Sequence, residues 1–355
     1  MVLVLGVSAG ASGARGIVAH SDQPQLSPID SCVVPRRSGG GVEDSALRAV
    51  ALMRAAAAER SELISATAIT YRTEAQADAI EAAVGSPGRH QHVRVVNEAE
   101  AQLRYLRLTE QLPTSGSIIL YDLGSSGLTL TLADCDSDTV IATRRNTVIG
   151  GDSYDALLRW RLARAGVTAD PALCRRYREA LSTVRVVTAE DPASGGRVVV
   201  TRADFDDLVA AGVHHSASLI RQILDENGRT PDGVVLVGGC VHTPSIERAL
   251  RSALHVRVST APEPATVSAR GAVLLAGDRP TRVVRVVRAI GGGARPPKPT
   301  PSRRKVLAAL AITGMLGITV GGVTLLNQVD QPADQGGTSA TQMEVAGIPK
   351  DPFDR

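Results

Sequence analysis

The chain has 355 residues, enough for one two-part domain or two ordinary domains, and 21% of them are charged, which is typical of a globular protein. A formal net charge of +3 is too small to indicate nucleic-acid binding, and no interleaving of aromatic and basic residues supports it. The four cysteines are far apart and show no metal-binding spacing, so we expect reduced thiols and a cytoplasmic main domain.

The first predicted element is a short apolar strand that leads into a Gly-rich turn. Residues 2–7 are apolar, and the turn comprises Gly10, Ala11, Ser12 and Gly13. A turn of this composition exposes backbone N–H groups where no side chain blocks an approaching phosphate. Taken alone, the same pattern is also typical of an ordinary hairpin.

Helical and extended patterns alternate after this turn. We expect helices over residues 42–59, 74–84 and 97–108, with strands over residues 64–70 and 93–96. This alternation predicts a sheet that is covered by helices. Glu98 lies at the start of the last helix, where an acid either stabilises the helix dipole or orients a water molecule for catalysis.

A second Gly-rich turn repeats the first. Asp122 ends a buried strand, and an alternating strand follows the turn. The turn residues are Gly124, Ser125, Ser126 and Gly127. The two segments superpose with Ser8 at the position of Asp122, which is placed to hold a metal ion beside a phosphate. The repeat predicts two similar half-domains that each offer a turn to one ligand.

The rest of the soluble part predicts a third turn. Gly151 opens a helical stretch that continues to about residue 185, and a β segment near residues 197–201 precedes a long helix over residues 202–226. An apolar strand then leads to Gly238 and Gly239, where bare backbone would let a nucleotide base or ribose approach closely.

In this order, the motifs resemble those of the actin, sugar-kinase and DnaK superfamily, and specifically the nucleotide-binding domain of DnaK-type (heat-shock 70-like) chaperones. The resemblance covers residues 3–277. It implies an α/β fold of the bilobed, actin-like ATPase type, built from two duplicated ribonuclease-H-like halves. Residues 1–115 would form the first lobe, completed by residues 262–278, and residues 116–261 the second.

The resemblance also implies a site for ATP or ADP with Mg²⁺. Asp122 and Glu98 would be the catalytic residues, and Asp122 would also hold the metal ion. The implied nucleotide-binding residues are Gly10, Ala11, Ser12, Gly13, Gly124, Ser125, Ser126, Gly127, Gly151, Gly238, Gly239 and His242.

Several positions depart from the family pattern. Ser8 and Thr129 stand where the family has acids, and Ser182 and Thr183 stand where it has the Glu and Lys that clasp ribose and adenine. The part that would carry a catalytic Lys, the peptide-binding domain and the lid have no counterpart in the sequence. Because phosphoryl transfer depends on charge neutralisation and positioning, we expect ATP hydrolysis to be weak or absent. Nucleotide binding through backbone N–H groups depends less on these side chains, so it tolerates their loss better.

Three kinds of function follow from this comparison. The first is a nucleotide-responsive switch or scaffold at the cytoplasmic face of a membrane, and the second is a degenerate scaffold that binds no nucleotide. The third, an active chaperone ATPase, is disfavoured by the missing peptide-binding domain. A sugar kinase also belongs to the superfamily, but no sugar-site acid stands out.

The C-terminal part predicts membrane anchoring. A basic, Gly- and Pro-rich linker over residues 279–305 precedes Val306–Leu326, an uncharged stretch about 30 Å long if helical, which predicts one transmembrane helix. Basic residues before it place the N-terminal domain in the cytoplasm and the disordered tail over residues 327–355 outside the cell. The Gly317 and Gly321 spacing suits pairing of membrane helices. By analogy, we expect envelope-associated protein partners.

Overall fold

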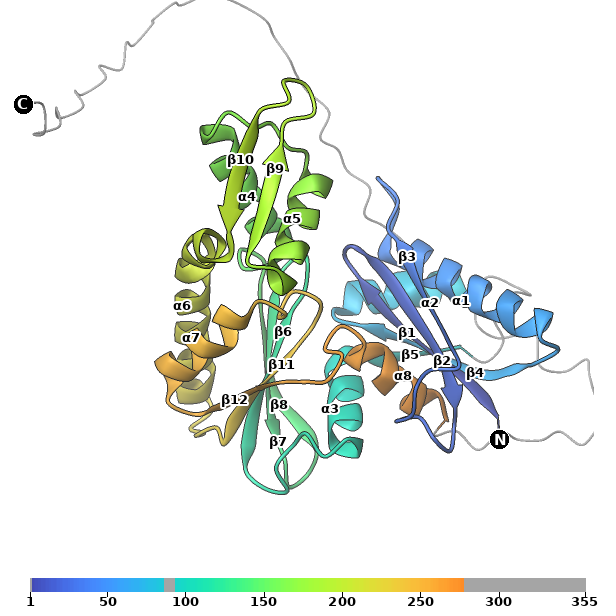
Figure 1. Cartoon of the computed structure of the whole chain (residues 1–355). Helices are drawn as coiled ribbons and strands as arrows, with labels where there is room; N and C mark the ends of the chain where they lie inside the picture. Colours follow the sequence, from blue (N-terminus) through green and yellow to red (C-terminus); the bar gives the residue numbers. More distant parts are fainter. Residues whose placement is uncertain (1, 86–92, 278–355) are drawn as a thin grey trace, which may run out of the picture. The chain divides into compact units, whose positions relative to one another are not determined.

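A computed structural model describes residues 2–85 and 93–277 (Figure 1). These residues form two five-stranded sheets, a separate two-stranded hairpin and eight helices within the part of the chain that the structure describes. All of them belong to one unit, residues 1–284. The four cysteines are free thiols, as the sequence predicts.

The first sheet is built from the N-terminal part of the chain. Its strands are β1 (Leu3–Gly10), β2 (Gly13–His20), β3 (Asp30–Pro35), β4 (Ile64–Tyr71) and β5 (Val93–Asn97), in the spatial order β3-β2-β1-β4-β5. β2 is antiparallel to both β1 and β3, whereas β4 runs parallel to β1 and to β5. β1 is buried along nearly its whole length, as its continuous apolar sequence requires of a central strand.

The second sheet repeats this arrangement. Its strands are β6 (Ser117–Leu123), β7 (Leu128–Asp134), β8 (Thr139–Asn146), β11 (Gly233–Val237) and β12 (Arg257–Thr260), in the order β12-β11-β6-β7-β8. Counted from β8, two antiparallel pairings are followed by two parallel ones, as in the first sheet counted from β3. β1 and β6 therefore hold equivalent central positions, and each ends in a Gly-rich turn.

Helices cover both faces of the first sheet. The helices of this part are α1 (Val42–Glu59), α2 (Glu74–Val84), α3 (Glu98–Leu108) and α8 (Val267–Gly277). α1 packs on one face of the sheet and α8 on the other, while α3 packs against α8 and against the second sheet. α3 and α8 therefore lie between the two sheets (Figure 1).

Two glycines allow α8 to approach its neighbours closely. A Cβ on Gly6 of β1 would lie 2.1 Å from the Ala269 carbonyl oxygen, and a Cβ on Gly271 of α8 would lie 1.8 Å from the Ala101 carbonyl oxygen. Neither position leaves room for a side chain. The contact between β1, α8 and α3 is therefore a contact of backbone on backbone, which fixes where the strand ends point.

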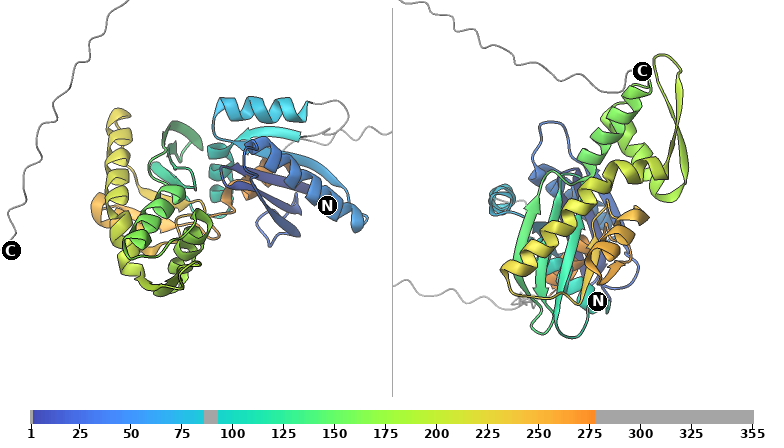
Figure 2. Two further views of the ribbon diagram at one scale, coloured as in Figure 1. Left: turned by 90° about the horizontal axis from the view of Figure 1, so that it is seen from above. Right: turned by 90° about the vertical axis from the view of Figure 1, so that its left-hand side faces the viewer.

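The second sheet carries the larger hydrophobic core. The remaining elements are α4 (Gly151–Arg164), α5 (Pro171–Thr183), α6 (Arg202–Glu226), α7 (Pro244–Leu254) and the hairpin of β9 (Val186–Glu190) and β10 (Arg197–Thr201). α4, α6 and α7 pack on one face of the sheet. Figure 2 shows the β9–β10 hairpin extending beyond this sheet beside α4 and α5.

The expected fold class needs correction. The described residues form a mixed α/β structure with two five-stranded sheets, and none of their helices is long and apolar enough to cross a membrane. The longest helix, α6, carries charged residues along its length, from Arg202 to Glu226. Several predictions fall outside the described residues. They are the linker, the transmembrane helix Val306–Leu326 with its Gly317 and Gly321 pair, and the C-terminal tail. The assignment of membrane and cytoplasmic sides stays a prediction.

Asp191 ties the β9–β10 hairpin to the connection between α4 and α5. Its carboxylate accepts hydrogen bonds from the backbone N–H groups of Thr168 (2.7 Å), Ala193 (2.8 Å) and Ser194 (3.0 Å). These N–H groups hold the pKa of the Asp191 carboxyl well below its usual range. A lowered pKa means that the stabilisation is complete above the ordinary aspartate pKa of about 3.9 and is lost as the pH falls further.

We therefore expect the hairpin to lose protection from hydrogen exchange in acid before the sheets do. Exchange should be compared at about pH 7 and about pH 3, as protection factors corrected for intrinsic rates. Asp191→Asn should remove most of this pH dependence, whereas Asp78→Asn, at an exposed position of α2, should leave it unchanged. Equal acid sensitivity in wild type and Asp191→Asn would contradict the assignment.

Candidate functional site

The two Gly-rich turns share one geometry. Gly13 (φ +146) and Gly127 (φ +155) each close a hairpin, with a backbone conformation that side chains rarely adopt. A Cβ at Gly13 would lie 2.2 Å from a carbonyl oxygen of β3, and one at Gly127 would lie 2.5 Å from a carbonyl oxygen of β8. Packing of the third strand thus excludes a side chain at both positions.

The third turn lies over the end of β6. Gly238 has φ +93, and a Cβ there would lie 2.4 Å from Asp122 Oδ1. The Cys240 N–H donates to the Leu123 carbonyl at 3.0 Å, and the Gly238 N–H donates to the Pro264 carbonyl at 2.9 Å. The turn after β11 is therefore held directly beside the turn after β6, and Gly238 must be glycine for this contact to form.

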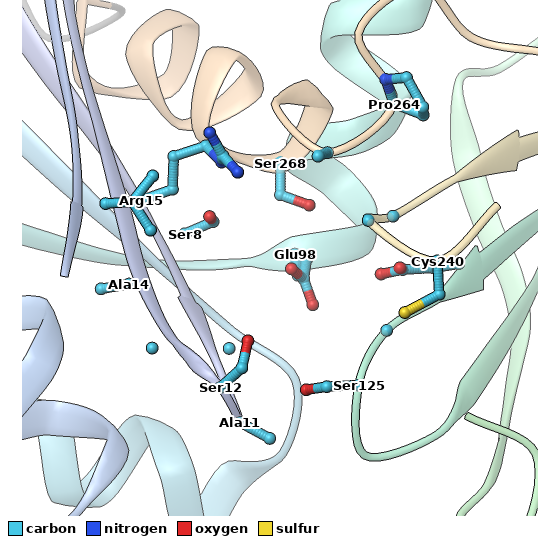
Figure 3. Close-up of a pocket in the computed structure, with 18 of the residues that line it drawn as sticks. Ser8, Ala11, Ser12, Ala14, Arg15, Glu98, Ser125, Cys240, Pro264 and Ser268 are labelled. Atoms are coloured by element: carbon cyan, nitrogen blue, oxygen red, sulfur yellow. The ribbon is translucent and has the colours of Figure 1, made fainter. Parts of the chain in front are cut away.

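One pocket of about 310 Å³ brings the three turns together. Of the predicted site residues, those that line it are Gly10, Ala11, Ser12, Gly13, Glu98, Asp122, Gly124, Ser125, Gly238 and Gly239. In Figure 3, Ser12 of the first turn and Ser125 of the second lie on opposite sides of the space into which Glu98 points. The pocket is therefore lined by segments from both sheets.

A cluster of one cation and two acids lies in this pocket. The Arg72 guanidinium forms ion pairs with Glu98, through Nε and through Nη2 at 3.2 Å, and with Asp122 Oδ2 at 3.4 Å. Gln102 Nε2 donates to the same Asp122 oxygen at 2.9 Å and to Ser268 Oγ at 3.0 Å. The two carboxylates are thus already bound by side chains of the chain itself.

Burial makes this cluster electrostatically strong. The residues Glu98 and Asp122 are 5% and 4% exposed, and the Arg72 side chain is 16% exposed. Burial by itself lowers the pKa of Arg72, but the carboxylates of Glu98 and Asp122 raise it more, and the net shift is upward. Burial, reinforced by Asp122, raises the pKa of Glu98, and Arg72 opposes this. Arg72 therefore stays charged at every physiological pH.

The residues present do not fit a magnesium ion held by protein carboxylates. The space between Glu98 and Asp122 is taken by the Arg72 guanidinium, which would repel a divalent cation. Ser8, at the position equivalent to Asp122, offers no charge. Within residues 2–85 and 93–277 no cluster of three or more His, Cys, Asp or Glu side chains could hold a metal.

A second buried ion pair lies under the pocket wall. Arg178 of α5 donates through Nε to Asp155 Oδ1 of α4 at 2.6 Å, and its Nη1 lies 3.7 Å from the Cys240 sulfur. Burial raises the pKa of Asp155, and Arg178 opposes this shift. This pair joins α4 and α5 beside the turn that carries Cys240.

Four predicted site residues do not line the pocket. Gly151 begins α4 and donates its N–H to the Gly124 carbonyl at 3.0 Å, so it helps to hold the second turn in place. Gly127 closes the same turn, and Ser126 accepts a hydrogen bond from Arg145 at 2.8 Å. His242 is exposed. Their predicted roles as nucleotide contacts stay predictions.

The side chains of Ser182 and Thr183 also lie away from the pocket. Their hydroxyls donate to carbonyls of their own helix, α5, at 2.6 and 3.0 Å. Glu179 and Arg175, one and two turns earlier in α5, line the pocket instead and form an ion pair at 2.8 Å. The i, i+4 spacing of these two residues predicts an ion pair on one face of the helix but not that this face meets the pocket.

Arg72 is the main pocket residue that sequence reasoning missed. β4 and β5 run parallel, with Tyr71 paired to Asn97, so the residues that follow these strands, Arg72 and Glu98, must lie side by side. The signal was therefore present in the two predicted strands. Other missed lining residues are Arg15, Cys240 and Ser268.

Comparison with known proteins gives two kinds of match. A family of unknown function (DUF7159) matches residues 156–284. The chain is also similar to proteins named chaperone protein HscA homolog, an Hsp70-type chaperone. It is 30% identical over 213 residues to the protein of Shewanella sp. (strain MR-7). It is 29% identical over 208 residues to that of Paracidovorax citrulli and 31% identical over 200 residues to that of Methylibium petroleiphilum.

These matches cover about half of the chain but only part of each relative. For the same three proteins, 53%, 53% and 52% of this chain is matched, against 33%, 33% and 32% of theirs. The chain therefore spans about a third of the length of the curated relatives it matches. The similarity supports an Hsp70-like relationship for the matched part.

Proposed function

We propose that this chain is a chaperone-like nucleotide-binding protein that takes ATP or ADP in the pocket formed by the three turns. The observation that carries the proposal is that equivalent Gly-rich turns of two repeated sheets line a single pocket. The similarity to HscA homologues supports the same class of function. The pocket volume of 310 Å³ is within the range of about 300–1,000 Å³ found for small-molecule sites.

The chemistry of the walls suggests how the nucleotide lies. The phosphates would approach the turns at Gly10–Gly13 and Gly124–Ser125, where no large side chain intervenes. The ribose and base would lie against Gly239, whose position tolerates close approach, with Arg175 and Glu179 of α5 as polar contacts. A ligand in this position touches both sheets, so its binding can change the surface that a protein partner meets.

Hydrolysis is expected to be slow. Glu98 and Asp122 are the available acids, but Arg72 engages both, so neither is free to orient an attacking water molecule. Ser8 supplies no second metal-orienting charge. The proposal is therefore of a nucleotide-responsive switch or scaffold in which turnover, if present, is weak. Without nucleotide binding, the chain would act as an interaction scaffold alone.

Thermal unfolding of the full chain with ADP or ATP tests this proposal. Ligand at roughly 100 times its dissociation constant adds about 2.7 kcal/mol to the free energy of unfolding, which should raise Tm by at least about 5 °C. Gly239→Val should abolish the shift, because its Cβ meets only Ala265 at 3.9 Å and the side chain enters the pocket without a clash. Phosphate release measured in the same samples reports turnover.

Gly196→Val is the matched control, in the β9–β10 loop, where only the Ser194 hydroxyl comes within 4 Å of the new Cβ. It should keep the ligand-induced shift. If millimolar nucleotide, with or without Mg²⁺, leaves the Tm of the wild type unchanged, nucleotide binding is refuted and the scaffold alternative stands.

A further inference from the structure

We infer that this pocket takes the metal-free form of the nucleotide, with the Arg72 guanidinium in the place of a divalent cation. The inference rests on the proposed nucleotide binding and specifies which form of the ligand the site recognises. The resemblance implies Mg²⁺, but Arg72 engages both Glu98 and Asp122 and leaves neither carboxylate free for a metal ion.

The position of Arg72 is fixed by the fold around it. It directly follows β4, its backbone N–H donates to Gln76 Oε1 at 3.0 Å, and the Gln76 amide donates in turn to the Ala9 carbonyl at 2.9 Å. Gln76 is on the first turn of α2, whose N-cap is Thr73. The start of α2 therefore anchors Arg72 to the end of β1, next to the first Gly-rich turn.

The orientation of the guanidinium leaves one nitrogen for a ligand. Among the described residues, the hydrogen bonds of Arg72 to Glu98 and Asp122 use Nε and Nη2 but not Nη1. A Cβ placed on Gly124 would lie 3.4 Å from Nη1, so this nitrogen lies beside the second turn. Its two N–H donors are available to a phosphate oxygen at that turn, in the planar geometry that suits such a contact.

Arg72 offsets part of the negative charge of this pocket without a metal ion. Glu98 and Asp122 carry two negative charges, which by themselves would repel a polyphosphate. Arg72 offsets one of these charges, and the Gln102 amide satisfies the Asp122 oxygen that Arg72 also contacts. A divalent cation could bind the carboxylates only after displacing a buried guanidinium from both. Arg72 thus performs the charge screening that Mg²⁺ supplies at other nucleotide sites.

The test is titration of the full chain with a fluorescent ADP analogue, once with Mg²⁺ and once with EDTA. For the wild type we expect the two dissociation constants to agree within about threefold. Arg72→Ala should weaken binding in EDTA by at least about tenfold, because a charge-assisted contact is lost and two carboxylates face the phosphates. Mg²⁺ should restore part of that loss in the variant.

Mn²⁺ alone, followed by electron paramagnetic resonance, gives a readout that does not depend on nucleotide. The wild type should bind no Mn²⁺ at this site, whereas Arg72→Ala should gain a site, since Glu98 and Asp122 become free. Arg72→Gln, which keeps a polar side chain, should behave in the same way and guards against misfolding of the alanine variant.

Arg60→Ala is the matched control. Arg60 also bridges two carboxylates, Asp30 at 3.0 Å and Glu62 at 2.9 Å, but on the surface and outside the pocket. It should change neither titration. Tight binding by the wild type only when Mg²⁺ is present would overturn the inference and leave the proposed function standing. Absence of binding under both conditions would overturn both.

Discussion

Gly271→Ala should destabilise the protein by about 3 kcal/mol or more, because the new Cβ would lie 1.8 Å from the Ala101 carbonyl oxygen and 2.3 Å from its carbon. Backbone cannot move aside as a flexible side chain does, so α8 and α3 must separate. A loss of this size is a large fraction of the about 5–15 kcal/mol that holds a typical domain folded. Urea unfolding followed by circular dichroism measures it.

Gly212→Ala provides the matched control in another helix. Gly212 lies in α6, and its Cβ would meet the Tyr154 ring of α4 at 3.5 Å, an ordinary van der Waals contact. Alanine favours helix over glycine by about 0.5–1 kcal/mol, so this variant should be as stable as the wild type or slightly more stable. A loss of less than about 1 kcal/mol for Gly271→Ala would show that α3 and α8 do not pack as described.

Arg178→Ala should also have a large effect, about 3–5 kcal/mol, because it leaves the Asp155 carboxylate buried and unpaired. Both residues are only 6% exposed. Burial already raises the pKa of Asp155, and loss of Arg178 removes the main opposing influence. A carboxyl whose pKa is raised by folding destabilises the folded state increasingly as the pH rises, so the penalty should grow between about pH 4 and pH 8.

Chemical unfolding of Arg178→Ala across this pH range is the measurement. Arg175→Ala, one turn earlier on α5, removes an i, i+4 pair whose side chains are 45% and 52% exposed, and it should lose less than about 0.5 kcal/mol. The double variant Arg178→Met with Asp155→Leu should recover most of the stability, since no charge is left buried. Equal stability of the two arginine variants would refute a buried pair.

The sequence predicted the helices well because their signals are local. The expected ranges 42–59, 74–84 and 202–226 agree with α1, α2 and α6, and Thr73 and Thr201 cap the last two through side-chain oxygens. The helical stretch from Gly151 to about residue 185 proved to be two helices, α4 and α5. Asp170 caps the start of α5, with Pro171 as its first residue.

Strands at sheet edges were missed for a physical reason. In β3 and β9 apolar residues also occupy exposed positions, Val33 and Val186 among them, and most positions of β8 are half-buried, so the residue types do not alternate as in a typical half-buried strand. Pairing with a neighbouring strand, rather than their own pattern, holds them in the sheet. Such strands become visible only when the neighbour is known.

In the candidate site, too, local patterns could be predicted from the sequence, whereas contacts between distant segments could not. The three turns could be predicted because glycine and serine in a hairpin are a local pattern. Arg72 is a single charged residue after a strand, and its role depends on the parallel pairing of β4 with β5 and on the turn that begins α2. Arg175 and Glu179 required knowledge of which face of α5 meets the pocket.

The repeated sheets have one further consequence. At equivalent places in the two hairpins, Ser8 is paired across the strands with Arg15, whereas Asp122 is paired with Thr129. These equivalent positions therefore differ in charge, with a basic residue in the first hairpin and an acidic one in the second. A molecule lying between the two turns would meet unlike chemical groups at these two places, so its two ends would not be interchangeable.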